Sequence, residues 1–150
     1  RRDSAAYFAT MFDFVVRAIL GDESAGRVDV SGRSLSLVVE EHGERDSAAI
    51  ATVKLLAFDL AALAASMESQ RTFPRLLIHD GPREADMAPE IYERLFLLAR
   101  ELEECCSGEP SFQYILTTTS PPPEACRQEP WLRLKLSGVP ADGRFLRCDL

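Results

Sequence analysis

Residues 75–86 read RLLIHDGPREAD, which indicates a strand that ends in an aspartate and is followed by a turn. The apolar run at residues 76–78 is continuous rather than alternating, which is typical of a parallel strand buried on both faces. Asp80 follows the run, and Gly81 and Pro82 indicate a turn. Many nucleotide hydrolases hold a magnesium ion with an aspartate in this position, and such enzymes also need a phosphate-binding loop.

The neighbouring segments favour alternating strands and helices. We expect a strand over residues 75–80, a helix over residues 87–104 with Asp86 as its N-cap, and a second buried strand over residues 112–117. This order implies a parallel crossover. A helix over residues 48–69 is apolar nearly all round and is predicted to be buried. Lys54 and Asp59 interrupt it and are expected on its one exposed edge.

Further elements are expected before residue 48 and after residue 131. Residues 3–20 predict a helix that ends at Gly21, with four apolar side chains on one face: Phe8, Phe12, Val15 and Ile19. Short strands are expected over residues 28–30 and 35–39, and a terminal hairpin over residues 132–136 and 145–148. We therefore expect a single α/β domain spanning residues 1–150, whose successive parts are residues 1–46, 47–120 and 121–150.

Composition narrows the class of protein. The net charge of −7 over 150 residues argues against strong nucleic-acid binding by this segment alone. The four cysteines lack metal-ligand spacing and indicate reduced thiols in a cytoplasmic protein. No uncharged apolar run reaches about 18 residues, so we expect no membrane span. The chain begins Arg-Arg-Asp rather than with methionine, and we expect a fragment of a longer protein.

A phosphate-binding loop is not evident. The nearest match is GDESAGRV at residues 21–28, which has the glycine spacing of G-x-x-x-x-G-K-S/T. Arg27 replaces the lysine, Val28 replaces the magnesium-binding hydroxyl residue, and the stretch follows a helix rather than a strand. We interpret it as a connecting turn. His79 lies inside an apolar strand and is expected to be a hydrogen-bonded core histidine.

Three features in order nevertheless resemble a known family. A polar loop containing Ser47 opens a long buried helix, a strand ends in Asp80 followed by GPREAD, and a later strand ends in TTTS at residues 117–120. This order resembles the C-terminal half of the ABC-type ATPase head of SMC-, RecN- and RecF-like coiled-coil ATPases. Heads of that family are split, with a P-loop half, an inserted coiled coil and then a second half. The resemblance covers roughly residues 5–150 and implies one lobe of a P-loop NTPase fold.

The strand that ends in Asp80 is similar to a Walker B strand. The resemblance implies that Asp80 holds Mg²⁺ through the water shell of the ion. Gly81 stands where common ABC enzymes carry a catalytic glutamate, so Glu84 becomes the candidate for polarising the attacking water. The residues TTTS replace the usual switch histidine, and Thr118 or Thr119 would take its hydrogen-bonding role.

The stretch ERDSAAIATVK at residues 44–54 stands in the place of the ABC signature. Here the resemblance implies that Ser47 and Arg45 contact the γ-phosphate of ATP bound on an opposing head, since a helix N-terminus favours an anion. Ala48 and Ala49 replace the usual signature glycines.

The resemblance also implies partners. ATP and Mg²⁺ would lie between two heads, with a homodimer and the N-terminal P-loop half of the same protein as partners. The setting would be DNA repair, chromosome maintenance or defence against foreign DNA, with DNA bound by the full-length protein. This chain alone is expected to be inactive for lack of a P-loop. The alternative is a non-catalytic interaction or dimerisation domain derived from such a head.

Overall fold

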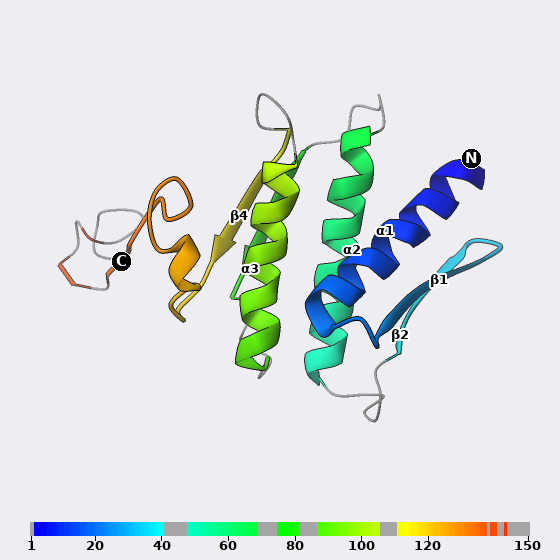
Figure 1. The fold of residues 1–150 in the computed structure, drawn as a ribbon, viewed down its shortest axis with the longest axis horizontal. Helices are drawn as coiled ribbons and strands as arrows, with labels where there is room; N and C mark the ends of the chain where they lie inside the picture. Colours follow the sequence, from blue (N-terminus) through cyan, green and yellow to red (C-terminus); the bar gives the residue numbers. More distant parts are fainter. Residues whose placement is uncertain are drawn as a thin grey trace. The chain divides into compact units, whose positions relative to one another are not determined.

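The computed structural model describes residues 2–40, 48–68, 75–81, 87–105, 111–137, 139–140 and 143. The chain has a mixed α/β structure with three α-helices and two small sheets among these residues (Figure 1). It divides into two compact units, Arg1–Ser120 and Pro121–Leu150. Each unit is described by itself, and the expectation of a single domain stays a prediction.

Helix α1 (Arg2–Leu20) has the apolar face that its spacing predicts. Phe12, Val15 and Ile19 are fully buried in the core, and Phe8 packs against them. The helix ends at Gly21, whose N–H group donates to the carbonyl oxygen of Arg17 at 2.8 Å. Gly21 has a φ of +112°, a backbone conformation that favours glycine at the end of a helix.

Strands β1 (Ala25–Ser31) and β2 (Ser34–Glu40) form the expected antiparallel hairpin, and both are longer than the sequence predicted. The pairs Gly26/Val39, Val28/Leu37 and Val30/Leu35 share one face of this hairpin. Burial falls along that face from Val39 to Val30. The hairpin is thus anchored at its base, and its tip is exposed.

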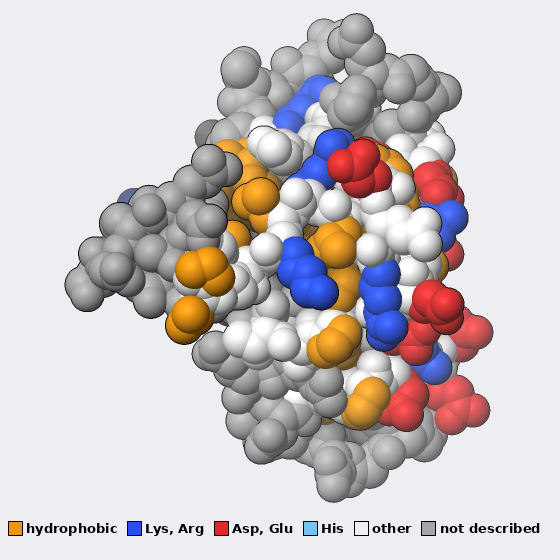
Figure 2. Space-filling view, turned by 90° about the vertical axis from the view of Figure 1, so that its left-hand side faces the viewer, with side chains coloured by type: hydrophobic (Ala, Val, Ile, Leu, Met, Phe, Trp, Pro, Cys, Tyr) orange, Lys and Arg blue, Asp and Glu red, His pale blue; other side chains and the backbone are white. Residues whose placement is uncertain are grey.

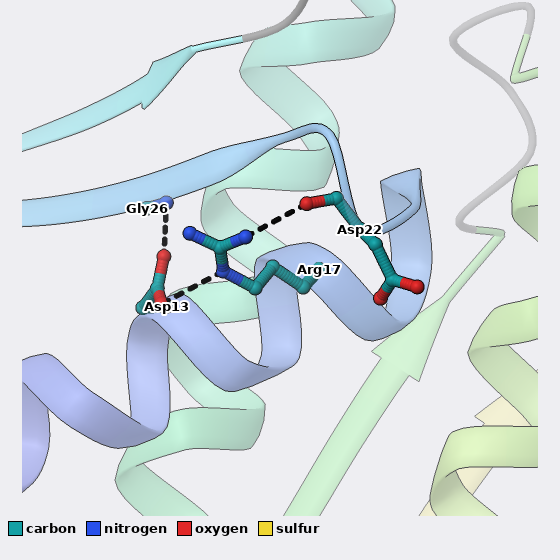
Figure 3. Close-up of polar contacts among 4 residues, drawn as sticks. All are labelled: Asp13, Arg17, Asp22 and Gly26. Atoms are coloured by element: carbon teal, nitrogen blue, oxygen red, sulfur yellow. Dashed lines mark hydrogen bonds and ion pairs between the residues drawn. The ribbon is translucent and has the colours of Figure 1, made fainter.

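A polar clasp joins the base of the hairpin to α1 (Figure 3). The Gly26 N–H group donates to Asp13 Oδ1, and Arg17 Nε donates to Asp13 Oδ2, both at 2.9 Å. Arg17 also donates to the carbonyl oxygen of Asp22 at 2.7 Å. A Cβ atom on Gly26 would lie only 2.8 Å from Val16 Cγ2. The strand can therefore approach the helix this closely only because residue 26 is glycine.

Helix α2 (Ala48–Glu68) forms the centre of the core, as its apolar composition predicts. Its buried apolar residues are Ile50, Val53, Leu56, Ala57, Leu60, Ala61, Leu63 and Ala64. The segment Ile50–Met67 is long and apolar enough to span a membrane by length and composition. Half of that segment is buried within the protein, and core helices of soluble proteins meet the same two criteria. The expectation of no membrane span stays a prediction.

Helix α3 (Pro89–Glu104) buries Tyr92, Leu95 and Leu98 in the same core. It begins later than predicted, because Ala88 is its N-cap and Pro89 takes the first helical position. A residue before proline favours extended backbone, and proline is well suited to the first turn of a helix. Asp86, the predicted cap, lies outside the described residues.

Strands β3 (Leu76–Asp80) and β4 (Gln113–Thr117) confirm the predicted parallel pair, in register from Leu76↔Gln113 to Asp80↔Thr117. On one face of the pair, three side chains pack against the core: Leu77, Tyr114 and Leu116. The opposite face, which we call the open face, exposes three large apolar side chains: Leu76 (48%), Ile78 (57%) and Ile115 (40%). The prediction that these strands are buried on both faces is therefore wrong for the described residues.

The second unit contains the short 3₁₀ helix η1 (Glu124–Cys126), in which the Cys126 side chain is buried. Arg127 Nε donates to the carbonyl oxygen of Pro122 at 2.8 Å and closes the loop before this helix. Residues 132–137 do not form the predicted strand within the described part of the chain. The predicted partner strand over residues 145–148 lies outside the described residues.

Candidate functional site

The candidate site lies at the carboxyl ends of β3 and β4. Asp80 and Thr117 are the last residues of the two strands and are paired in register. Thr117 Oγ1 donates a hydrogen bond to Asp80 Oδ1, and the Gly81 N–H group donates to the Thr117 carbonyl oxygen at 3.1 Å. Both side chains are exposed. Because the carboxyl ends of parallel strands meet at one edge, a carboxylate and a hydroxyl stand together at the position where open α/β sheets bind ligands.

The turn after Asp80 depends on a glycine. Gly81 has a φ of +56°, in the left-handed region that residues with a Cβ atom enter at a cost of about 1–2 kcal/mol. This is the position where the family resemblance would place a catalytic glutamate. The backbone there is arranged for a turn, and a glutamate could adopt it only with strain. Glu84, the alternative candidate for the base, lies outside the described residues.

The two predicted switch residues occupy different environments. Thr118 Oγ1 lies 2.7 Å from the hydroxyl oxygen of Tyr92 on α3, and it accepts the N–H group of Ser120 at 3.2 Å. Thr119 is exposed. The hydroxyl that contacts Asp80 belongs instead to Thr117, which sequence reasoning did not select. The sequence does hold a signal for Thr117. If two parallel strands of equal length pair in register, their last residues lie side by side, and these residues are Asp80 and Thr117.

Oxygen ligands at this edge suit magnesium. Mg²⁺ prefers carboxylate and other oxygen ligands and keeps several of its own waters, so a single exposed carboxylate beside a hydroxyl fits water-mediated binding. Among the residues that the structure describes, no three or more His, Cys, Asp or Glu side chains gather as a metal cluster. Arg45 and Ser47, the predicted phosphate contacts, lie outside those residues.

A hydrogen-bonded chain behind Asp80 connects three elements. Asp59 Oδ2 on α2 lies 3.1 Å from His79 Nε2, and His79 Nδ1 lies 2.9 Å from the hydroxyl oxygen of Tyr114 on β4. The His79 side chain is only 11% exposed, which confirms the expectation of a hydrogen-bonded core histidine. Asp59 lies at the margin of the exposed edge of its helix, with its side chain 31% exposed, and its carboxylate turns toward His79.

The donors and acceptors in these hydrogen bonds follow from the chemistry of Asp59 and Tyr114. A carboxylate oxygen accepts hydrogen bonds, so Nε2 of His79 is the donor in the contact with Asp59. Burial and, secondarily, the negative charge of Asp59 raise the pKa of the Tyr114 hydroxyl, which therefore keeps its proton. Tyr114 can then donate to Nδ1 of His79. Both ring nitrogens are engaged, so His79 is suited to a structural role.

Surface charge is mixed on the face drawn in Figure 2. Acidic side chains gather along its right-hand border, while basic and hydrophobic side chains alternate over its centre. A nucleic-acid surface needs clustered Lys and Arg, and the basic side chains on this face are interspersed with hydrophobic ones. DNA binding by the full-length protein stays a prediction.

Comparison with models of known protein families gave no match. Comparison with curated proteins also gave no match. The resemblance of this chain to an ATPase head therefore stays a prediction.

Proposed function

We propose that this chain is the C-terminal lobe of an ATP-hydrolysing head of the SMC/RecN-like kind. One observation carries the proposal. Asp80 ends a parallel strand, contacts Thr117 at the end of the neighbouring strand, and stands beside a sheet face that no described element covers. A two-stranded parallel sheet with a bare apolar face is unusual, because parallel sheets are normally covered on both sides. The arrangement is what one half of a larger sheet would present.

The partner in this proposal is a P-loop half of the same head. Its strands and helices would cover the side chains of Leu76, Ile78 and Ile115, which the described residues leave exposed. Covering these side chains supplies a hydrophobic driving force for joining the two halves. The completed head would then pair with a second head across ATP, with Ser47 and Arg45 contributed by the opposing copy.

The residues of this chain would act mainly through positioning and charge, as is general in phosphoryl transfer. ATP and Mg²⁺, when bound, supply the reacting phosphate and neutralise its charge. Asp80 would hold the water shell of the ion, and the Thr117 hydroxyl would fix the orientation of that carboxylate. Glu84 is proposed to orient the attacking water, and Thr118 or Thr119 to sense the phosphate.

The reading frame that contains this chain provides the test. We expect its upstream portion to encode G-x-x-x-x-G-K-S/T followed by heptad repeats, and the joined protein to hydrolyse ATP. Asp80→Asn should lower kcat by at least about tenfold, since metal-bound charge stabilisation is worth several kcal/mol. Asp29→Asn, at an exposed carboxylate on β1, is the matched control and should leave kcat unchanged. Residues 1–150 alone should show no turnover.

Two results would refute the proposal. One is a full reading frame without a phosphate-binding loop whose product binds no ATP. The other is ATP turnover by residues 1–150 alone at a rate that Asp80→Asn leaves unchanged.

A non-catalytic interaction or dimerisation domain is the second candidate. The observation that favours it is Gly81, since its left-handed backbone disfavours the glutamate that common ABC enzymes use. In this case the open face would join two protein subunits without nucleotide. Sedimentation of the product of the full reading frame with and without Mg²⁺–ATP distinguishes the two candidates. A stable dimer that ATP does not affect, and that Ile78→Asp dissociates, would favour the interaction domain.

A further inference from the structure

Strand β3 carries two of its three large aliphatic side chains on the more exposed of its two faces. Leu76 and Ile78 lie on the open face, whereas Leu77 and His79 point toward the core. Side chains alternate along a strand, so a shift of one residue would exchange the two sets. Burial of apolar area alone favours the exchanged arrangement, because two large aliphatic side chains would enter the core in place of one. Polar side chains must therefore select the observed face, and β3 has two of them: Asp80 at the end of the outward set and His79 in the inward set.

His79 is the polar side chain that holds the inward set in place. It is held from both sides, by Asp59 of α2 at 3.1 Å and by Tyr114 of β4 at 2.9 Å. The Tyr114 ring also meets the His79 ring edge to face, with ring centres 5.4 Å apart. These contacts exist only when residue 79 points inward, and the exchanged arrangement would lose all of them.

The neighbouring strand does not share this ambiguity. In β4, Tyr114 and Leu116 point inward, while Gln113, Ile115 and Thr117 point outward. Polar residues at both ends of the outward set fix the direction of β4 without help. The inward Tyr114 is then in place to hold His79, and the face of β3 follows from that of β4.

We infer that His79, held by Asp59 and Tyr114, is the positioning residue that sets which face of β3 carries Asp80. Because Asp80 adjoins His79, an inward His79 places the carboxylate on the open face beside Thr117. The same contacts keep Leu76 and Ile78 outward. This inference concerns the chain itself and holds whatever Asp80 binds.

Solvent exposure of methyl groups tests the inference directly. A soluble gadolinium chelate should broaden the methyl NMR signals of Ile78 in the wild-type protein much more than those of Leu77. In His79→Leu, the inward side chain loses its contacts with Asp59 and Tyr114 and only Asp80 is left to orient the strand, so we expect the ratio of the two broadenings to fall toward one or the signals to double. Val53→Ala, in the core of α2, is the matched control for destabilisation and should keep the wild-type ratio.

Milder variants keep the inference testable if His79→Leu does not fold. Tyr114→Phe and Asp59→Asn each remove one partner of His79 and should each lower the ratio in part. The ¹⁵N shifts of His79 should report a proton on Nε2 in the wild-type protein and a mixture of tautomers in Asp59→Asn. Wild-type ratios in all three variants would overturn the inference, as would an equal fall in Val53→Ala.

Discussion

The side chain of Asp13 joins helix α1 to strand β1. Its two oxygens accept from the Gly26 N–H group and from Arg17. Burial opposes ionisation of this carboxyl, but the hydrogen bonds from Arg17 and Gly26, with the charge of Arg17, outweigh that effect and lower its pKa below 3.8. The group is more than a third exposed, so solvent weakens the ion pair, and the hydrogen bond to the buried backbone of β1 is the contact that matters.

The stability of the protein should depend on pH through Asp13. A carboxyl whose pKa is lowered by folding contributes its stability above its ordinary pKa of 3.8, and that contribution disappears as pH falls through the folded-state value. Asp13→Asn should therefore unfold more easily than the wild-type protein near neutral pH, and the difference should narrow in acid. Urea titrations at several pH values measure this, with Asp29→Asn as control. A difference that widens below pH 3.8 contradicts the expectation.

Single residues were the hardest features to predict from the sequence. The contact of Asp59 with His79 could not be predicted, because the two residues are distant in sequence and only the folded pairing of α2 with β3 brings them together. Thr117 was overlooked for a similar reason. Its neighbour Thr118 belongs to the same run of hydroxyl residues, and the strand register alone decides which of them contacts Asp80. His79 was predicted correctly, because a lone histidine in an apolar strand is usually buried and bonded.

At the element scale, the two orientations of β3 differ little in free energy, because the burial of its aliphatic side chains and the hydrogen bonds of His79 favour opposite faces. Burying a Leu or Ile side chain fully is worth about 1.5–3 kcal/mol, and the half-exposed Leu76 and Ile78 forgo part of that. The hydrogen bond from His79 to a carboxylate contributes about 1.5–3 kcal/mol, and the one with Tyr114 about 0.5–1.5 kcal/mol. Terms of similar size oppose each other, so the choice of face depends on a few polar atoms. For this reason the apolar run at residues 76–78 predicted a strand but not its orientation.

The close approach of β1 to α1 predicts the effect of a single methyl group. In Gly26→Ala the new Cβ atom would lie 2.8 Å from Val16 Cγ2 and 3.1 Å from the backbone of Asp13. The backbone cannot move aside easily, so we expect a loss of about 1–3 kcal/mol in the free energy of unfolding. Chemical denaturation measures this. Ser36→Ala, on the exposed face of β2, should change stability by less than about 0.5 kcal/mol. Equal effects of the two substitutions would count against the close packing described here.

Helices were predicted best among the elements. Their apolar spacing reports the core face directly, and the buried residues of α1, α2 and α3 match it. The start of α3 was misplaced because Asp86 and Pro89 both mark helix beginnings, and the proline determined the result. The strand over residues 132–136 was predicted from the alternation of Leu with Arg and Lys. Alternation alone does not supply the neighbouring backbone that a strand needs.

At the scale of the whole molecule, the hydrophobic core that the structure describes lies in the first unit, Arg1–Ser120. Every residue of the core cluster lies before Ser120, where the first unit ends. A protein of residues 1–120 should therefore fold alone and unfold cooperatively, with a Tm within about 4 °C of the full chain. Differential scanning calorimetry of both lengths measures this. A broad, non-cooperative transition in the shorter protein would mean that the second unit is required for the fold.

Gly81 has a consequence for how this sequence can change over time. Glycine and glutamate codons can differ by one base, so a glutamate after Asp80 is within reach of a single mutation. The φ of +56° at this position penalises that step, because the turn would have to rearrange before the new side chain could be used. A lineage that began with glycine here would gain a carboxylate more easily at another position. The backbone of one residue thus limits which side chains can follow Asp80.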